Sequence, residues 1–297
     1  ITDEQHRFGV KQRAALTQKG QNPHLLVMSA TPIPRTLGLI IFGELDISII
    51  DEMPPGRTPV KTVLIGADKH ARAYNFIKEN INKGQQCFVV CPLVNEGAIE
   101  AQAAESYAAE LMLQEFADIP VGVLHGKMKP KQKAEVMEQF AKNELSILVA
   151  TTVIEVGIDV PNATIMLIEN AERFGLSQLH QLRGRVGRGS KKSWCILVSD
   201  SQNENTLQRL AAMCKTNDGF KIADEDLKQR GPGDFFGNKQ HGLPQLKIAE
   251  FSDSATVELS SQAANEIIEH SPDLSAPELK YLLGSIKRLF PKGNLTL

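Results

Sequence analysis

The middle of the chain alternates between short apolar, β-branched runs and longer amphipathic stretches. Between residues 57 and 200 the short runs predict strands at Lys61–Ile65, Gln86–Val90, Val121–Leu124, Ser146–Ala150, Ile165–Glu169 and Ser193–Val198. The longer stretches repeat apolar residues at helical spacing and predict helices at Lys69–Asn82, Ala98–Phe116, Lys129–Ala141 and Leu176–Arg185. Short buried strands that alternate with helices are typical of a parallel sheet with helices on both faces. We therefore predict one complete α/β domain here.

The two flanks of this domain show different patterns. Residues 1–56 predict helices at Gly9–Lys19 and from Pro32 to Phe42, and strands at His24–Met28 and Asp46–Ile50. The proline-rich segment MPPGRTP (residues 53–59) predicts a stiff linker. After residue 200, helices at Asn203–Cys214 and Asp218–Gln229 predict a helical hairpin, and a Gly/Pro-rich loop (231–244) precedes helices at Ser254–His270 and Pro277–Leu289. The chain opens on ITDE, which resembles a strand end and lacks an initiator methionine, so we expect a piece of a larger protein.

Composition places the chain among ordinary globular proteins. It has 297 residues, 42% of them hydrophobic, and a formal net charge of −2. That charge argues against a uniformly basic nucleic-acid coat, so any nucleic-acid contact must come from local patches. The best patch is Arg183, Arg185, Arg188, Lys191 and Lys192.

The chain shows no signal for membrane insertion or export. No apolar run approaches the roughly 18 residues of a membrane span, and no signal peptide is recognisable. The four cysteines form no Cys-x-x-Cys pair, which favours buried thiols over a metal site. We expect a cytoplasmic protein without a membrane partner.

An arginine row within QLHQLRGRVGRG (residues 178–189) is the most informative chemical feature. Gln178, Gln181, Arg185 and Arg188 are spaced by three, four and three residues, which predicts one helix face. Planar, permanently charged guanidinium groups suit the charge on a transferring phosphoryl group. Gly184, Gly187 and Gly189 suggest that something approaches the backbone closely. The spacing alone also fits a basic, solvated helix end.

Two polar groups follow predicted strands near the start of the chain. Asp3 and Glu4 stand where a strand would end, which fits a site for Mg²⁺ and for water activation, although an acidic loop is the plainer explanation of these two residues alone. Ser29 and Thr31 follow the next predicted strand. Their hydroxyls can sense a phosphate, cap the following helix, or do both.

Further polar loops follow later strands. His125-Gly126-Lys127 can approach a backbone phosphate, or Lys127 is a solvated loop charge. Thr151 and Thr152 present hydroxyls and amides where a phosphodiester could lie. Gly157 and Asp159 offer a tight turn and a carboxylate suited to a ribose hydroxyl. A G-x-x-x-x-G-K-[ST] phosphate loop does not occur in the 297 residues.

Five stretches resemble motifs of superfamily 2 helicases and occur in the same order. They are DEQH (3–6), SATPIPRTL (29–37), HGKMKP (125–130), ATTVIEVGIDVPNA (150–163) and QLHQLRGRVGRG (178–189), similar to motifs II, III, IVa, V and VI. IDEMPPGR (50–57) and RGPGDFFGNKQHG (230–242) resemble the RecG-type family of ATP-dependent, fork-remodelling DNA helicases. The resemblance implies RecA-like parallel sheets with helices on both faces. It divides the chain into the end of motor domain 1 (1–56), motor domain 2 (57–200), a translocation hairpin and loop (201–246) and a helical tail (247–297).

The resemblance also implies residue roles on the ATP side. Asp3 would hold Mg²⁺ and Glu4 would activate water, while His6, Ser29 and Thr31 would couple the nucleotide to DNA. Gln181, Arg185 and Arg188 would reach the γ-phosphate across a cleft. Gly157 and Asp159 would touch the nucleotide.

On the DNA side, the implied contacts are His125, Lys127, Thr151 and Thr152, and the implied translocation network is Arg209, Arg230 and Gln240. A helical hairpin packed for stability alone is the plainer alternative for that network. The expected partners are forks and junctions of double-stranded DNA, with a single-stranded-DNA-binding protein as a further candidate.

Without the phosphate loop, ATP turnover is expected of a complete protein and not of these 297 residues alone. Two other functions remain open at this point. One is a nucleic-acid- or partner-binding module without catalysis, and the other is a transcription-repair coupling translocase.

Overall fold

The computed structural model describes residues 1–3, 24–30, 47–92, 98–151, 159–230 and 254–289. The chain divides into two compact units. The first contains residues 1–32 and 51–226, and the second contains residues 33–50 and 227–297.

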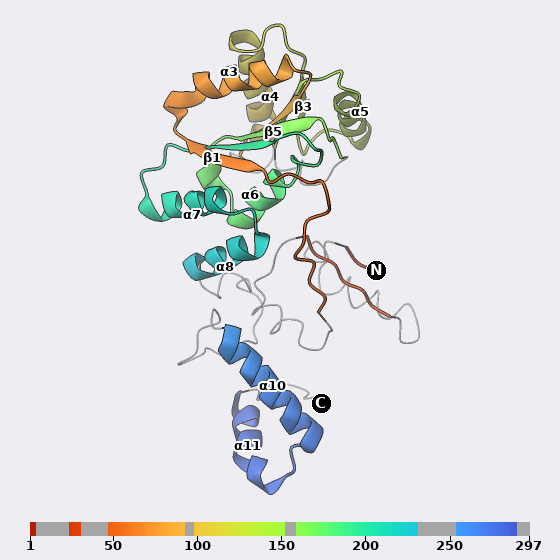
Figure 1. The fold of residues 1–297 in the computed structure, drawn as a ribbon, viewed down its shortest axis with the longest axis vertical. Helices are drawn as coiled ribbons and strands as arrows, with labels where there is room; N and C mark the ends of the chain where they lie inside the picture. The colour runs from red at the N-terminus through yellow and green to blue at the C-terminus, as the bar shows by residue number, and fades with distance from the viewer. Residues whose placement is uncertain (4–23, 31–46, 93–97, 152–158, 231–253, 290–297) are drawn as a thin grey trace. The chain divides into compact units, whose positions relative to one another are not determined.

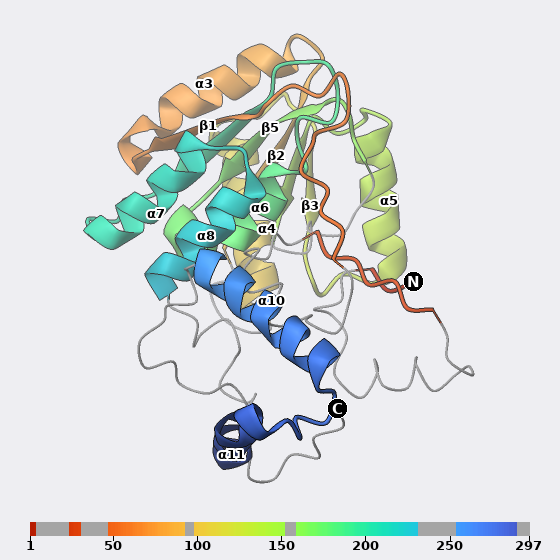
Figure 2. The same ribbon diagram turned by 60° about the horizontal axis from the view of Figure 1, so that its bottom comes forward.

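A six-stranded parallel sheet forms the centre of the first unit (Figures 1 and 2). Its strands are β1 (Lys61–Ile65), β2 (Gln86–Val90), β3 (Val121–Leu124), β4 (Ile147–Ala150), β5 (Ala163–Ile168) and β6 (Trp194–Val198). Their spatial order is β1-β6-β5-β2-β4-β3, and every neighbouring pair is parallel. The predicted RecA-like parallel sheet is confirmed.

Helices cover both faces of the sheet because each central strand is apolar on both sides. On one face lie α3 (His70–Ile81) and α4 (Ala98–Gln114), and on the other lie α5 (Pro130–Ala141), α6 (Leu176–Arg183), α7 (Glu204–Lys215) and α8 (Gly219–Arg230). Figure 1 shows α3 and α4 above the sheet and α6 and α7 below it. Along β2 the faces alternate: Phe88 and Val90 pack with Phe140 of α5, while Val89 packs with Ile77 of α3. Two short 3₁₀ turns, η2 (Ala67–Lys69) and η4 (Ala171–Arg173), lead into α3 and α6.

Most predicted boundaries agree with the structure to within two residues. The bounds of β1, β2 and β3 match those predicted from the apolar runs. The helix expected over Leu176–Arg185 ends two residues earlier, at Arg183, because Gly184 follows as its C-cap. Arg185 and Arg188 therefore lie in a loop, and the prediction that they share a helix face with the glutamines is wrong.

The described residues before the linker show little regular structure. Of the predicted strand His24–Met28, only Val27 pairs, in an isolated parallel bridge with Thr2. Residues 47–50 form no strand, so the prediction for Asp46–Ile50 is wrong within its described part. Several apolar side chains here are exposed, among them Leu26 at 53% and Ile50 at 89%. The two helices predicted between residues 9 and 42 lie outside the described residues.

The second unit contains α10 (Ser254–His270), η5 (Pro277–Leu279) and α11 (Lys280–Leu289). The α10 bounds equal those predicted, and the last predicted helix is divided into η5 and α11. The fourfold domain division stays a prediction. Within the described ranges, none of the helices combines the length and apolarity needed to cross a membrane.

Candidate functional site

A tight turn in the proline-rich linker directs Arg57 towards the loop that follows α6. The Arg57 amide donates to the Pro54 carbonyl at 3.3 Å, and Gly56 has a φ of +82°. Proline early in a turn and a positive φ at its third residue are typical of a type II turn, which explains the sequence Pro54-Pro55-Gly56-Arg57. The Arg57 side chain then donates to the carbonyls of Gly187 at 3.0 Å and Gly184 at 3.4 Å.

The loop after α6 depends on its glycines. Gly187 has a φ of +74°, and a Cβ placed there would lie 2.6 Å from a side-chain methyl carbon of Val60. A Cβ on Gly189 would lie 3.2 Å from the Pro161 carbonyl oxygen. The close approach suggested by the glycine spacing is thus made by the linker and by the segment before β5.

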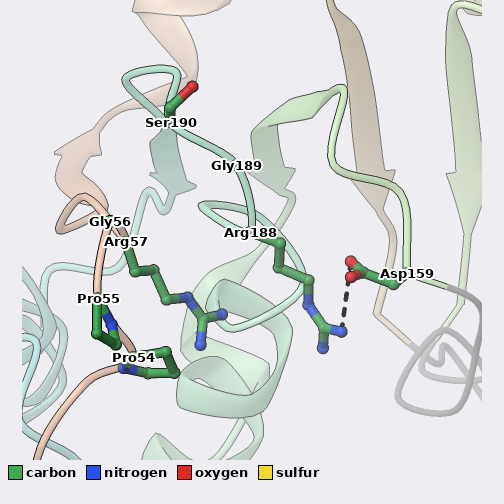
Figure 3. Close-up of a pocket in the computed structure, with 8 residues that line it drawn as sticks. All are labelled: Pro54, Pro55, Gly56, Arg57, Asp159, Arg188, Gly189 and Ser190. Carbon is green, nitrogen blue, oxygen red and sulfur yellow. Dashed lines mark ion pairs between the residues drawn. The ribbon is translucent and has the colours of Figure 1, made fainter.

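These segments enclose an open pocket of about 430 Å³ (Figure 3). It is lined by Pro54, Pro55, Gly56, Arg57, Asp159, Arg188, Gly189 and Ser190. Arg188 donates through Nε to the Gly184 carbonyl at 3.1 Å, and its Nη1 lies 3.5 Å from Asp159 Oδ1. In Figure 3, Arg188 lies between Arg57 and Asp159.

The pocket has the chemistry of an anion site. Two guanidinium groups meet in it, and the Arg188–Asp159 ion pair is open to water, with side-chain exposures of 30% and 55%. Exposed ion pairs of this kind contribute about 0–1 kcal/mol, so a phosphate can replace the carboxylate at little cost. Planar guanidinium groups bind phosphate oxygens in a bidentate geometry.

The pocket lies at the amino edge of the sheet, because its segments lead into β1, β5 and β6. Of the residues predicted for the nucleotide, it brings together Arg188 and Asp159 and adds Arg57. Gln181 is half-buried on α6, and Arg185 is half-buried in the loop, where it has interactions of its own. Gly157 lies outside the described residues.

A second group of predicted residues lies at the opposite, carboxyl edge. His125 follows β3 and Thr151 follows β4, and the Thr151 amide donates to the Leu124 carbonyl at 3.2 Å. Both side chains are buried, with exposures of 7% and 1%. His125 Nε2 lies 3.0 Å from Glu105 Oε1, whereas His125 Nδ1 and the Thr151 hydroxyl have no hydrogen-bond partner among the described atoms.

Lys127 is exposed at this edge, and Lys133 donates to the Gly126 carbonyl at 2.7 Å. Thr152 lies outside the described residues. DNA contact at this edge stays a prediction.

The acidic group cannot be completed from the described residues. Asp3 and Ser29 are exposed and take part in interactions of their own, while Glu4, His6 and Thr31 lie outside the described ranges. Within those ranges, no group of three His, Cys, Asp or Glu side chains is arranged to hold a metal ion. Of the two carboxylates predicted for the Mg²⁺ site, the structure therefore describes Asp3 and not Glu4.

The structure corrects the predicted basic patch at Arg183. Its side chain is 3% exposed, and Nη1 donates to Thr62 Oγ1 at 3.3 Å, to the Met213 carbonyl at 2.9 Å and to the Thr216 carbonyl at 2.8 Å. Arg183 thus caps the end of α7 and offers no surface charge to DNA. Burial lowers the pKa of the guanidinium.

The predicted translocation network is described only in part. Arg209 on α7 donates to the Glu172 carbonyl at 2.6 Å. Arg230 ends α8, but its side chain lies outside what the structure describes, as does Gln240.

Two features were not predicted from the sequence. One is the position of Arg57 in the pocket. The sequence Pro-Pro-Gly-Arg, which is typical of a tight turn, could have indicated it. The other is a buried network around Glu169, which accepts from Tyr107 at 2.7 Å and lies 3.0 Å from His70 Nε2. Burial, followed by the Glu169 charge, raises the pKa of Tyr107 above its usual range, and burial raises that of Cys91 to about 12. Nothing in the local sequence indicated this network.

Comparison with known proteins identifies the families that this chain resembles. The family described as helicase conserved C-terminal domain matches residues 68–190, and the family described as ATP-dependent DNA helicase RecG, domain 3, C-terminal, matches residues 216–295. The ATP-dependent DNA helicase RecG of Synechocystis is 48% identical over 286 residues, which are 95% of this chain and 34% of that protein. RecG of Bacillus subtilis is 47% identical over 284 residues, 95% of this chain and 42% of that protein.

A solved structure of RecG bound to a three-way DNA junction is also similar, with 45% identity and a TM-score of 0.68 over 88% of this chain and 33% of that one. Mss116p bound to single-stranded RNA and AMP-PNP has 18% identity and a TM-score of 0.52 over 70% of this chain and 44% of that one, which shows a shared fold.

The fold is that of the C-terminal motor lobe of superfamily 2 helicases. Within that class the chain belongs to the RecG family, whose C-terminal portion it matches. It spans between about a third and two fifths of the length of these curated relatives.

Proposed function

We propose that the chain is the C-terminal motor portion of an ATP-dependent DNA helicase that moves on branched double-stranded DNA. Its relatives are named ATP-dependent DNA helicases, and one is solved on a three-way DNA junction. Stalled forks and recombination junctions in the cytoplasm would be the substrates. A single-stranded-DNA-binding protein remains a further candidate partner.

The observation that carries this proposal is the pocket containing Arg57, Arg188 and Asp159. The Arg188 guanidinium, with Arg57 beside it, and a replaceable carboxylate fit the γ-phosphate of ATP, whose transfer is assisted mainly by positioning and charge stabilisation. Asp3 and Glu4 would hold the Mg²⁺ that accompanies ATP, and Gln181 and Arg185 would assist Arg188. Because no phosphate loop occurs in the 297 residues, we propose that this chain does not hydrolyse ATP by itself.

The DNA side of the motor would lie at the carboxyl edge. Lys127 is exposed there to meet a backbone phosphate, with His125, Thr151 and Thr152 in the same loops. Arg209, Arg230 and Gln240 would link the hairpin α7–α8 to the loop after it, so that nucleotide-driven closure moves DNA.

The decisive experiment is Arg188→Ala in the complete protein that carries this chain. We expect DNA-dependent ATP turnover to fall by at least about 10³-fold, because arginines that stabilise the transferring phosphoryl group contribute that much. Binding of a synthetic three-way junction should persist, since Arg188 lies at the amino edge. Lys83→Ala removes an exposed charge before β2, at the same edge of the sheet, and serves as the control, with turnover unchanged.

Unchanged turnover in Arg188→Ala would refute the assigned role. ATP turnover by the 297-residue chain alone would refute the claim that its nucleotide site is incomplete.

A further inference from the structure

The linker before β1 is docked along the loop that carries Arg188. Beyond the two bonds from Arg57, Thr58 Oγ1 donates to the Lys191 carbonyl at 3.2 Å and the Lys61 amide donates to the Ser193 carbonyl at 2.9 Å. Val60 fills the space that a side chain on Gly187 would need. The linker and the arginine loop thus form one packed unit, although about 130 residues separate them.

Arg57 and Arg188 share a single backbone acceptor. Arg188 Nε donates to the Gly184 carbonyl at 3.1 Å, and Arg57 Nη2 donates to the same oxygen at 3.4 Å. Gly184 follows the last residue of α6 and has αR dihedral angles (φ −64°, ψ −10°), so its carbonyl stands at the helix end, where intrahelical donors are lacking. Arg57 also binds the Gly187 carbonyl, next to Arg188 in the chain.

We propose that Arg57 is a positioning residue for Arg188, which it holds in the pocket through the carbonyls of Gly184 and Gly187. This inference rests on the proposed function of the pocket. The Arg57 guanidinium donates two of its N–H groups to carbonyls of the loop, so its direct effect is to fix the conformation of that loop. Because Arg57 lies where the first predicted motor domain joins the second, it ties the Arg188 loop to that connection.

The test compares Arg57→Ala, Arg57→Lys and Thr58→Ala with the unchanged protein in DNA-dependent ATP turnover. We expect Arg57→Ala to lower kcat by about 10- to 100-fold with KM for ATP within about twofold, because small displacements of a catalytic group cost rate. Lysine can reach only one of the two carbonyls, so Arg57→Lys should recover part of the loss. Thr58→Ala removes a bond of the same linker that does not touch Gly184, and its kcat should stay within about twofold.

A double substitution of Arg57 and Arg188 distinguishes a positioning role of Arg57 from a role that is independent of Arg188. Rates are expressed per correctly folded site, counted by junction binding. In the residual activity of Arg188→Lys, adding Arg57→Ala should cost much less than it costs alone, because residues that act through one another are non-additive.

Multiplicative losses, or a raised KM with unchanged kcat, would overturn the proposal. So would a normal kcat in Arg57→Ala, while a loss in Arg188→Ala would leave the proposed function standing. If the unchanged protein hydrolyses no ATP on DNA, the proposed function itself fails.

Discussion

Replacing Arg183 by alanine should destabilise the first unit strongly, although Arg183 lies within the arginine-rich stretch QLHQLRGRVGRG (178–189). Its guanidinium is buried and donates to the carbonyls of Met213 and Thr216 at the end of α7, while Nη2 lies 3.0 Å from His180 Nδ1. The last carbonyls of a helix have no intrahelical donor, so Arg183 supplies what α7 lacks.

The magnitude follows from what the truncation leaves behind. Two buried or half-buried carbonyls lose their donor, at about 1–3 kcal/mol each. The side chain also leaves a cavity, which adds to the cost. Against this, the native guanidinium pays a desolvation cost that alanine avoids. We therefore expect a net loss of about 3–5 kcal/mol in the free energy of unfolding, because the two carbonyls left without a donor and the cavity together outweigh the recovered desolvation cost.

Urea unfolding followed by the fluorescence of Trp194 measures this loss. Trp194 is the single tryptophan of the chain and lies in β6, edge-to-face with Phe76, so it reports on the first unit. Arg173→Ala removes an exposed arginine nearby and should stay within about 0.5 kcal/mol of the unchanged chain. A loss below about 1 kcal/mol for Arg183→Ala would show that solvent replaces its bonds and would refute the reasoning.

Three further predictions concern pH, backbone conformation and translocation. Burial, then the Arg183 charge, lowers the pKa of His180 from 6.5 to about 4. The free energy of unfolding should therefore keep its full value above pH 6.5 and fall by about 3 kcal/mol as the pH drops to 4. His180→Gln should remove that part of the pH dependence, and an unaltered profile would contradict it. Gly187→Ala should cost more than Gly84→Ala, since both have positive φ but only Gly187 faces Val60. Equal losses in urea unfolding would contradict the close contact. Gln240→Ala in the complete protein should spare ATP turnover but impair branch migration, and unwinding at the normal rate would sink its assigned role.

The succession of strands and helices was predictable because its causes are local. Runs such as Gln86–Val90 are apolar on both sides of the strand, and helices such as α10 repeat apolar residues at helical spacing. The helix α6 ends two residues before the predicted end. The spacing of the arginines is helical, but Gly184 ends the helix. Residues 47–50 (Ile-Ser-Ile-Ile) resemble a strand in sequence but form none in the structure. A strand needs a neighbouring strand to pair with, and the local sequence does not show whether one is present.

The candidate site could be assigned only in part from the sequence. The resemblance implied that Arg188 and Asp159 both face the nucleotide, and in the structure their charged groups lie 3.5 Å apart. Arg183 and Arg185 stand in the same motif, yet the sequence could not show that one of these arginines turns inward. That depends on the carbonyls of α7, about 30 residues further along the chain.

By itself, the sequence determined the fold class and the bounds of most elements, because periodicity and glycine position act over short distances. Its motifs indicated the class of chemistry proposed for the pocket only through their resemblance to a family. The tertiary structure alone decided which arginine faces solvent, which one caps a helix, and which residue of a distant linker meets the Arg188 loop. The reason is physical: burial and hydrogen-bond partners are set by neighbours in space, and Arg57 finds its acceptors on residues 127 and 130 positions away.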